Sequence, residues 1–229
     1  MAKKEEKTGL EFLESPDGLK QELGHDVEKI QKTVEQNKTA VIGLAGAIVV
    51  AVLGYFGYQY YATTQNEEGQ AKMYKAVYKF EADSNKIAAK EFAKIADEVG
   101  GQAASLANYY AGVAELKEGK YDAAIEHLKS FSSNDLLVQA RAYSLIGDAY
   151  AEKKAYGEAA DYYKKAAEYK PNKQFTPSYL MKLAAAYEAN NQSKEALEVY
   201  TEIVEKYAES SEYINAKKYK AMLEGSVSE

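Results

Sequence analysis

The sequence predicts an all-α protein in which one transmembrane helix near the N-terminus precedes an α-solenoid of about three to four helical hairpins and a C-terminal capping helix. Residues 39–66 contain no charged side chain, although charged residues are frequent on both sides. Farther along the chain, small residues recur at intervals that correspond to one helical hairpin. The chain has only 3 Pro in 229 residues and is rich in Ala, Lys and Glu, which favours long helices.

The uncharged segment has the length of a membrane span. The 22 residues from Ala40 to Tyr61 extend for about 33 Å as a helix, which matches a hydrocarbon core of about 30 Å. Tyr55, Tyr58 and Tyr60 lie near its end, as in an interfacial aromatic belt. A buried core helix is the alternative, but soluble helices rarely run this far without a charge. A cleaved signal peptide is disfavoured because the preceding 38 residues are net negative.

Charges beside the span predict its orientation. Lys29, Lys32 and Lys38 precede it, whereas Glu67 and Glu68 follow it. By the positive-inside rule, the N-terminus is expected in the cytoplasm and the long C-terminal part outside. The opposite topology, with the repeats facing the cytoplasm, remains an alternative.

A line of small residues marks one face of the span. Gly43, Ala47 and Ala51 recur every four residues, and such a face lets another membrane helix approach closely. We therefore predict a helix-packing site there, although ordinary Gly and Ala usage in a membrane span would produce the same pattern.

The first 38 residues form a charged arm with 7 Lys and 9 Asp or Glu. Ser15 and Pro16 resemble an N-cap followed by Pro at the first helical position. An amphipathic helix is predicted after them, because apolar residues recur every three or four positions: Leu19, Leu23, Val27, Ile30 and Val34.

Three similar stretches define the repeats. Each has a small residue followed twelve positions later by an alanine, and the pairs are Gly112 with Ala124, Gly147 with Ala159, and Ala184 with Ala196. These small residues are expected where the two helices of each hairpin cross most closely. Gly119-Lys120 and Asn190-Asn191 are predicted turns within hairpins, and Pro171 is predicted to follow the end of a helix.

This pattern resembles the tetratricopeptide repeat (TPR), and the spacing is close to the 34 residues that are typical of that repeat. The resemblance and the segments above give a predicted organisation of seven parts. They are a cytoplasmic arm (1–38), a transmembrane helix (39–62), a membrane-proximal TPR-like hairpin (63–101), three TPRs (102–136, 137–173 and 174–208) and a capping helix with a tail (209–229).

No motif for catalysis or cofactor binding is evident in the sequence. It has no Cys, and its two His residues, His25 and His127, are expected on opposite sides of the membrane. We find no phosphate-binding loop, metal-ligand spacing or nucleophile–base pair. The net charge of -6, with Arg141 as the only Arg, argues against nucleic-acid binding. The expected function is therefore protein–protein interaction without cofactor, metal or small-molecule substrate.

The TPR resemblance implies a concave groove that is lined by the first helix of each repeat. The positions that would line it are Leu106, Tyr109, Val113 and Leu116 in the first repeat, Arg141, Ser144 and Asp148 in the second, and Met181 and Lys182 in the third. Packing against neighbouring repeats is the alternative role for each of these side chains.

The order of arm, Gly-rich span ending in tyrosines, and TPR hairpins resembles the YfgM-type proteins of Gram-negative bacteria. The sequence segments NYYAGVAELKEGKYDAAIEHLKSFSS and YGEAADYYKKAAEYKP are most similar to the Bacteroidota versions. The resemblance implies an ancillary subunit of the inner-membrane Sec translocon, with periplasmic repeats that contact exported clients or chaperones. A scaffold subunit of another cell-envelope complex is the alternative.

Overall fold

The computed structural model describes Val27 and residues 31–227 of the chain. Most of the predicted amphipathic helix between Leu19 and Val34 lies outside the described residues, as do Ser15 and Pro16. Residues 31–36 are helical and Asn37 forms a turn. The chain divides into two compact units, residues 1–60 and residues 61–229.

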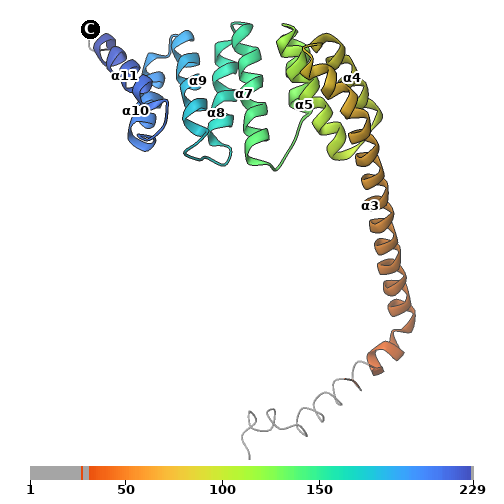
Figure 1. Ribbon diagram of the computed structural model, residues 1–229. Helices are drawn as coiled ribbons and strands as arrows, with labels where there is room; N and C mark the ends of the chain where they lie inside the picture. The colour runs from red at the N-terminus through yellow and green to blue at the C-terminus, as the bar shows by residue number, and fades with distance from the viewer. Residues whose placement is uncertain (1–26, 28–30, 228–229) are drawn as a thin grey trace, which may run out of the picture. The chain divides into compact units, whose positions relative to one another are not determined.

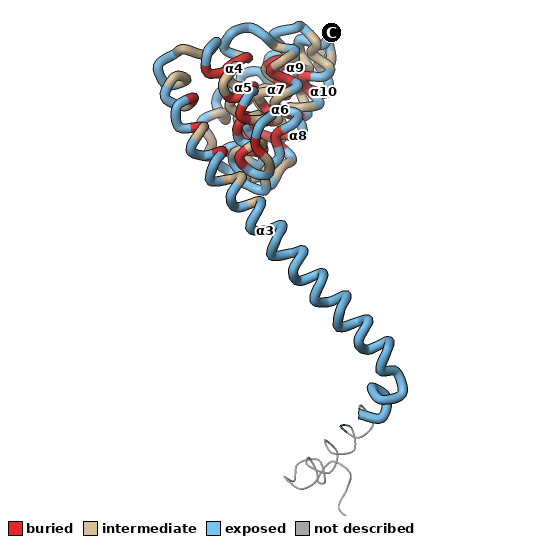
Figure 2. The backbone as a smooth tube through the Cα atoms, turned by 90° about the vertical axis from the view of Figure 1, so that its right-hand side faces the viewer, coloured by how far each residue is buried: buried red, intermediate tan, exposed pale blue. Residues whose placement is uncertain are grey.

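Helix α3 (Lys38–Glu81) has 44 residues and contributes to both units. Its apolar part is long and apolar enough to cross a membrane, by length and composition. Every described residue between 31 and 60 is exposed (Figure 2). The uncharged helix is therefore a candidate membrane span and does not match the alternative of a buried core helix.

Among the residues described, the regular elements of the second unit are all helices, and short loops join them (Figure 1). After the end of α3 come α4 (Asn85–Glu98), α5 (Gly101–Lys117), α6 (Tyr121–Ser130), α7 (Leu136–Glu152), α8 (Tyr156–Glu168), α9 (Thr176–Ala189), α10 (Ser193–Lys206) and α11 (Tyr213–Val227). Consecutive helices pack on each other as successive hairpins, which confirms the predicted all-α solenoid.

Local sequence explains several helix boundaries. The Asp135 carboxylate accepts hydrogen bonds from the backbone N–H groups of Leu137 and Val138 at 2.8 and 3.0 Å, which caps α7. Gly119 and Asn191 have positive φ angles of 71° and 60°, and they form the turns within two hairpins.

The hairpin crossings are packed as the small-residue pattern predicts. A Cβ added to Gly112 would lie 2.6 Å from Cγ of Leu128, and one added to Gly147 would lie 2.6 Å from Cε1 of Tyr163. Ala184 has no exposed surface, and neither have the alanines of the second helices, namely Ala124, Ala159 and Ala196. Only small side chains fit where these helices cross.

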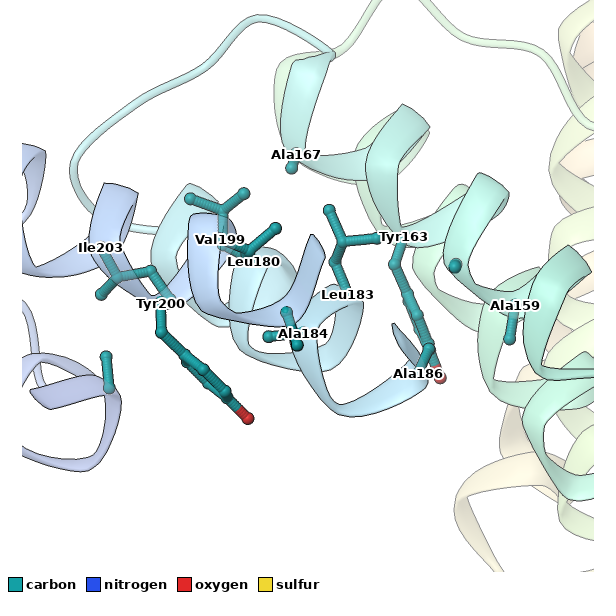
Figure 3. Packing of buried hydrophobic residues seen from close by; sticks show 13 residues of the cluster. Ala159, Tyr163, Ala167, Leu180, Leu183, Ala184, Ala186, Val199, Tyr200 and Ile203 are labelled. Atoms are coloured by element: carbon teal, nitrogen blue, oxygen red, sulfur yellow. The ribbon is translucent and has the colours of Figure 1, made fainter. Parts of the chain in front are cut away.

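Large side chains fill the space around these crossings. Tyr163, Leu180, Leu183, Tyr200 and Ile203 belong to the core cluster of α8, α9 and α10 (Figure 3). Two further clusters fill the hairpins before it, one around Phe92 and one around Leu128 and Ile146. Each cluster combines residues of successive hairpins, as expected in a solenoid.

Candidate functional site

The first helices of the three repeats, α5, α7 and α9, carry the candidate site. We use the term helix-A face for the six residues that interact across these helices: Tyr109, Arg141, Ser144, Asp148, Tyr179 and Lys182. Five of them are predicted groove positions, and Tyr179 is the sixth. These residues form a polar network around Asp148, and Arg141 is an exposed cation beside it.

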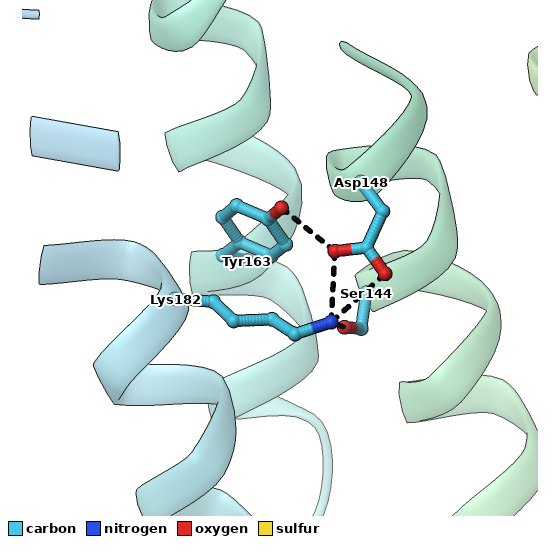
Figure 4. Close-up of polar contacts among 4 residues, drawn as sticks. All are labelled: Ser144, Asp148, Tyr163 and Lys182. Atoms are coloured by element: carbon cyan, nitrogen blue, oxygen red, sulfur yellow. Dashed lines mark hydrogen bonds and ion pairs between the residues drawn. The ribbon is translucent and has the colours of Figure 1, made fainter. Parts of the chain in front are cut away.

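The polar network joins the second and third repeats (Figure 4). The Nζ of Lys182 donates hydrogen bonds to both carboxylate oxygens of Asp148 at 2.8 Å and to Oγ of Ser144 at 3.2 Å. The hydroxyl of Tyr163 donates to Oδ1 of Asp148 at 2.7 Å. Burial raises the pKa of Tyr163, and the adjacent Asp148 carboxylate raises it further.

Ser144 and Lys182 belong to a network that is centred on Asp148. The Nζ of Lys182 donates hydrogen bonds to both oxygens of Asp148 and to the hydroxyl of Ser144. The three groups therefore connect repeats, and among the residues described no group of three or more His, Asp or Glu is arranged to hold a metal ion.

Arg141 is the exposed cation of the helix-A face. Burial raises the pKa of Tyr109 and of Tyr179, and the nearby Arg141 guanidinium opposes both shifts. Arg141 thus lies near tyrosines of the preceding and following repeats, although it forms no ion pair in the part of the chain that the structure describes. The exposed guanidinium is suited to bind a carboxylate or a backbone carbonyl of a partner.

The remaining predicted groove residues have different surroundings. Val113 and Leu116 pack against the core cluster of the first and second repeats, and Met181 packs against that of the third. Tyr109 is itself mostly buried, with its ring 5.1 Å from that of Phe131. Leu106 lines a cavity of about 450 Å³ beside the loop that follows α6. The surface that a partner would contact is therefore mainly polar.

The predicted membrane-packing residues Gly43, Ala47 and Ala51 lie on α3 and are exposed. A Cβ on Gly43 would meet no atom within 4 Å. The face is thus available to another membrane helix, and its use stays a prediction.

Sequence reasoning missed two contributions to the site region. Tyr179 is two residues before the predicted Met181 and three before Lys182, and the packing of α9 against α7 brings it near Arg141. Asn66 of α3 accepts a hydrogen bond from the backbone N–H of Ala103 at 3.1 Å and so caps the start of α5. Neither contact has a signal in the local sequence, because each joins residues of different hairpins.

Comparisons with known proteins agree with this architecture. A family model of the tetratricopeptide repeat-like domain matches residues 33–135, and a tetratricopeptide repeat model matches residues 178–210. Solved TPR-like repeats of a kinesin light chain protein from Podospora anserina superpose with a TM-score of 0.55 at 14% identity, over 67% of this chain and 84% of theirs. A single-substitution variant of the same repeats gives a TM-score of 0.54. These structures show the fold alone.

The chain is therefore a tetratricopeptide-repeat protein, and α3 is a candidate membrane span. It is also 31% identical over 182 residues to a protein of Neisseria gonorrhoeae named ancillary SecYEG translocon subunit, and the match covers 76% of this chain and 85% of the relative. The chain belongs to the family of that ancillary translocon subunit, which confirms the resemblance drawn from its sequence.

Proposed function

We propose that this protein is a non-enzymatic ancillary subunit of the Sec translocon. The observation that carries the proposal is the 31% identity to the ancillary SecYEG translocon subunit, which extends over 85% of that relative. A scaffold made of TPRs supplies binding surfaces without catalytic groups.

In this proposal α3 crosses the inner membrane with the N-terminus in the cytoplasm and the TPRs in the periplasm. The basic residues Lys32 and Lys38 before the span and the acidic residues Glu67 and Glu68 after it support this orientation. The face of Gly43, Ala47 and Ala51 would pack on the membrane helices of the channel.

The helix-A face would bind exported polypeptides or a periplasmic chaperone. Arg141 is exposed and lies near Tyr109 and Tyr179, so it can bind a carboxylate or carbonyl group of a partner. A single exposed cation would give weak and reversible binding. Such binding suits exported polypeptides, which must be released after translocation.

Three measurements test this function. Purification of the full-length chain in mild detergent should enrich the translocon subunits, and absence of enrichment would reject the assignment. A reporter fused to the C-terminus that is active only in the cytoplasm should stay inactive, because activity would show that the repeats face the cytoplasm. Proximity labelling from the same end would reveal another envelope complex as the main neighbour if the protein were its scaffold.

Clients can be trapped at the helix-A face with a photo-crosslinker at position 141. Crosslinks to exported proteins or periplasmic chaperones are expected there and not at the exposed Asp97 of α4, which is the matched control position.

A further inference from the structure

A second surface involves the second helices of the last two repeats, α8 and α10. A groove of about 420 Å³ runs between α8 and α10, over α9. Its floor consists of buried core residues that include Ala167, Leu180, Leu183 and Val199 (Figure 3). The helix-A face contributes no residue to it, so the groove is a separate site.

The rim of this groove is acidic. Glu195, Glu198 and Glu202 follow one another on α10 at spacings of three and four residues, which places them along one edge of the helix. Glu202 pairs with Lys206 at 3.0 Å. Glu195 and Glu198 form no ion pair among the residues described, so the rim has two carboxylates that lack a cationic partner.

The last helix, α11, presents the complementary surface. Ile214 and Met222 are 71% and 60% exposed, and Lys217 and Lys218 are exposed between them. Neither lysine forms an ion pair in the described part of the chain, although each lies near a tyrosine ring. The opposite side of α11 packs on α10 through Ala216, so the exposed side is a cationic amphipathic surface that no element of the described residues covers.

We propose that this groove docks α11 of a second copy of the chain. Ile214 and Met222 would lie over the groove, while Lys217 and Lys218 would pair with Glu195 and Glu198. Two turns of α11 separate Ile214 from Met222, and the two turns from Glu195 to Glu202 span about the same 10 to 12 Å. Because each copy has both surfaces, two copies can dock reciprocally in an isologous dimer.

The absence of cysteine from the chain makes the contact directly measurable. Full-length Glu198→Cys and Met222→Cys chains are mixed in neutral detergent and treated with a short bis-maleimide. The mixture should yield a crosslinked dimer, whereas Asp97→Cys mixed with Met222→Cys should not. Failure of the first mixture to crosslink, together with a monomeric mass by light scattering, would overturn the proposal.

Charge reversal tests the pairing itself. Glu195→Lys/Glu198→Lys and Lys217→Glu/Lys218→Glu should each weaken the dimer about tenfold or more, because several partly exposed ion pairs become repulsive at once. Mixing the two double variants should restore the dimer, since each Lys-bearing groove then meets a Glu-bearing helix. A control pair of reversals at Asp97 and Asp161, which are exposed and outside the groove, should leave the dimer unchanged. Misfolded variants would not recover on mixing, so lack of recovery, or full dimerisation of either double variant alone, would contradict the docking.

Discussion

Lys182 of α9 donates hydrogen bonds to both carboxylate oxygens of Asp148 on α7, and the two residues are 34 positions apart. That separation is one TPR length, so the ion pair connects equivalent helices of successive repeats. Tyr163 of α8 donates to the same carboxylate. Asp148 thus joins both helices of its own hairpin to the next repeat, and the pair is expected to contribute to the coupling between repeats.

We expect Lys182→Met to destabilise the chain by about 1 kcal/mol or less, because the pair is partly exposed. A double-mutant cycle with Asp148→Asn, followed by denaturant unfolding of the full-length chain in detergent, should give a coupling energy of about 0.5 to 1 kcal/mol. Lys164→Met is the control, since Lys164 lies 3.9 Å from Glu168 within one exposed helical turn. A coupling energy of zero would show that the pair does not hold the repeats together.

The close approach of Gly147 to Tyr163 predicts opposite effects of the same substitution at two glycines. Gly147→Ala should destabilise the chain by about 1 to 3 kcal/mol, because the new Cβ would overlap a ring that is held by its hydrogen bond to Asp148. Gly157→Ala should instead stabilise it by up to about 1 kcal/mol, since Ala is the better helix former and its Cβ would lie 3.7 Å from the nearest atom. Thermal unfolding by circular dichroism measures both. Equal shifts in Tm would contradict the packing argument.

The hairpins could be predicted from the sequence because their constraints are local. A small residue and an alanine twelve positions later determine how closely two adjacent helices cross, and Gly112 with Ala124 shows this in the structure. The candidate site depends on contacts between repeats. The approach of Arg141 to Tyr179 depends on how one hairpin packs on the next. The relative orientation of two hairpins leaves no short pattern in the sequence.

Glu115 of α5 shows a further limit of sequence reasoning. A TPR usually has an aromatic residue at this position, and the sequence alone does not show that the Glu is buried there. Its Oε2 accepts no hydrogen bond among the residues described, and the ring Nε2 of His127 lies 3.8 Å from it. Burial raises the pKa of Glu115, while His127 acts in the opposite direction.

Replacement of Glu115 should therefore stabilise the protein in a pH-dependent way. A carboxyl group whose pKa is higher in the folded state binds its proton more tightly there, so its ionised form opposes folding above its usual pKa of about 4.3. Glu115→Gln should raise the free energy of unfolding by about 1 kcal/mol at pH 8. The gain over the unaltered chain should shrink as the pH falls towards about 4, where Glu115 becomes protonated in both states.

Unfolding of both chains across this pH range provides the measurement. Glu118→Gln is the control, because Glu118 is exposed at the end of α5 and should leave stability unchanged at every pH. If the increase in the free energy of unfolding caused by Glu115→Gln stays constant with pH, ionisation of Glu115 is not its cause.

The small-residue face of α3 gives the prediction that bears most directly on the translocon. Ala47→Leu would place a large side chain between Gly43 and Ala51 and prevent close approach of a partner helix. Ala45→Leu adds the same side chain on the opposite side of the helix, about 200° away from position 47, and neither change alters charge. Both positions are exposed in the isolated chain, so neither substitution should disturb its packing.

We expect Ala47→Leu to reduce recovery of translocon subunits in mild detergent about tenfold, which corresponds to about 1.4 kcal/mol, and Ala45→Leu to leave this recovery unchanged. Equal recovery with both variants would show that the span contacts the channel through another face, and equal loss with both would point to a general effect of bulk on insertion.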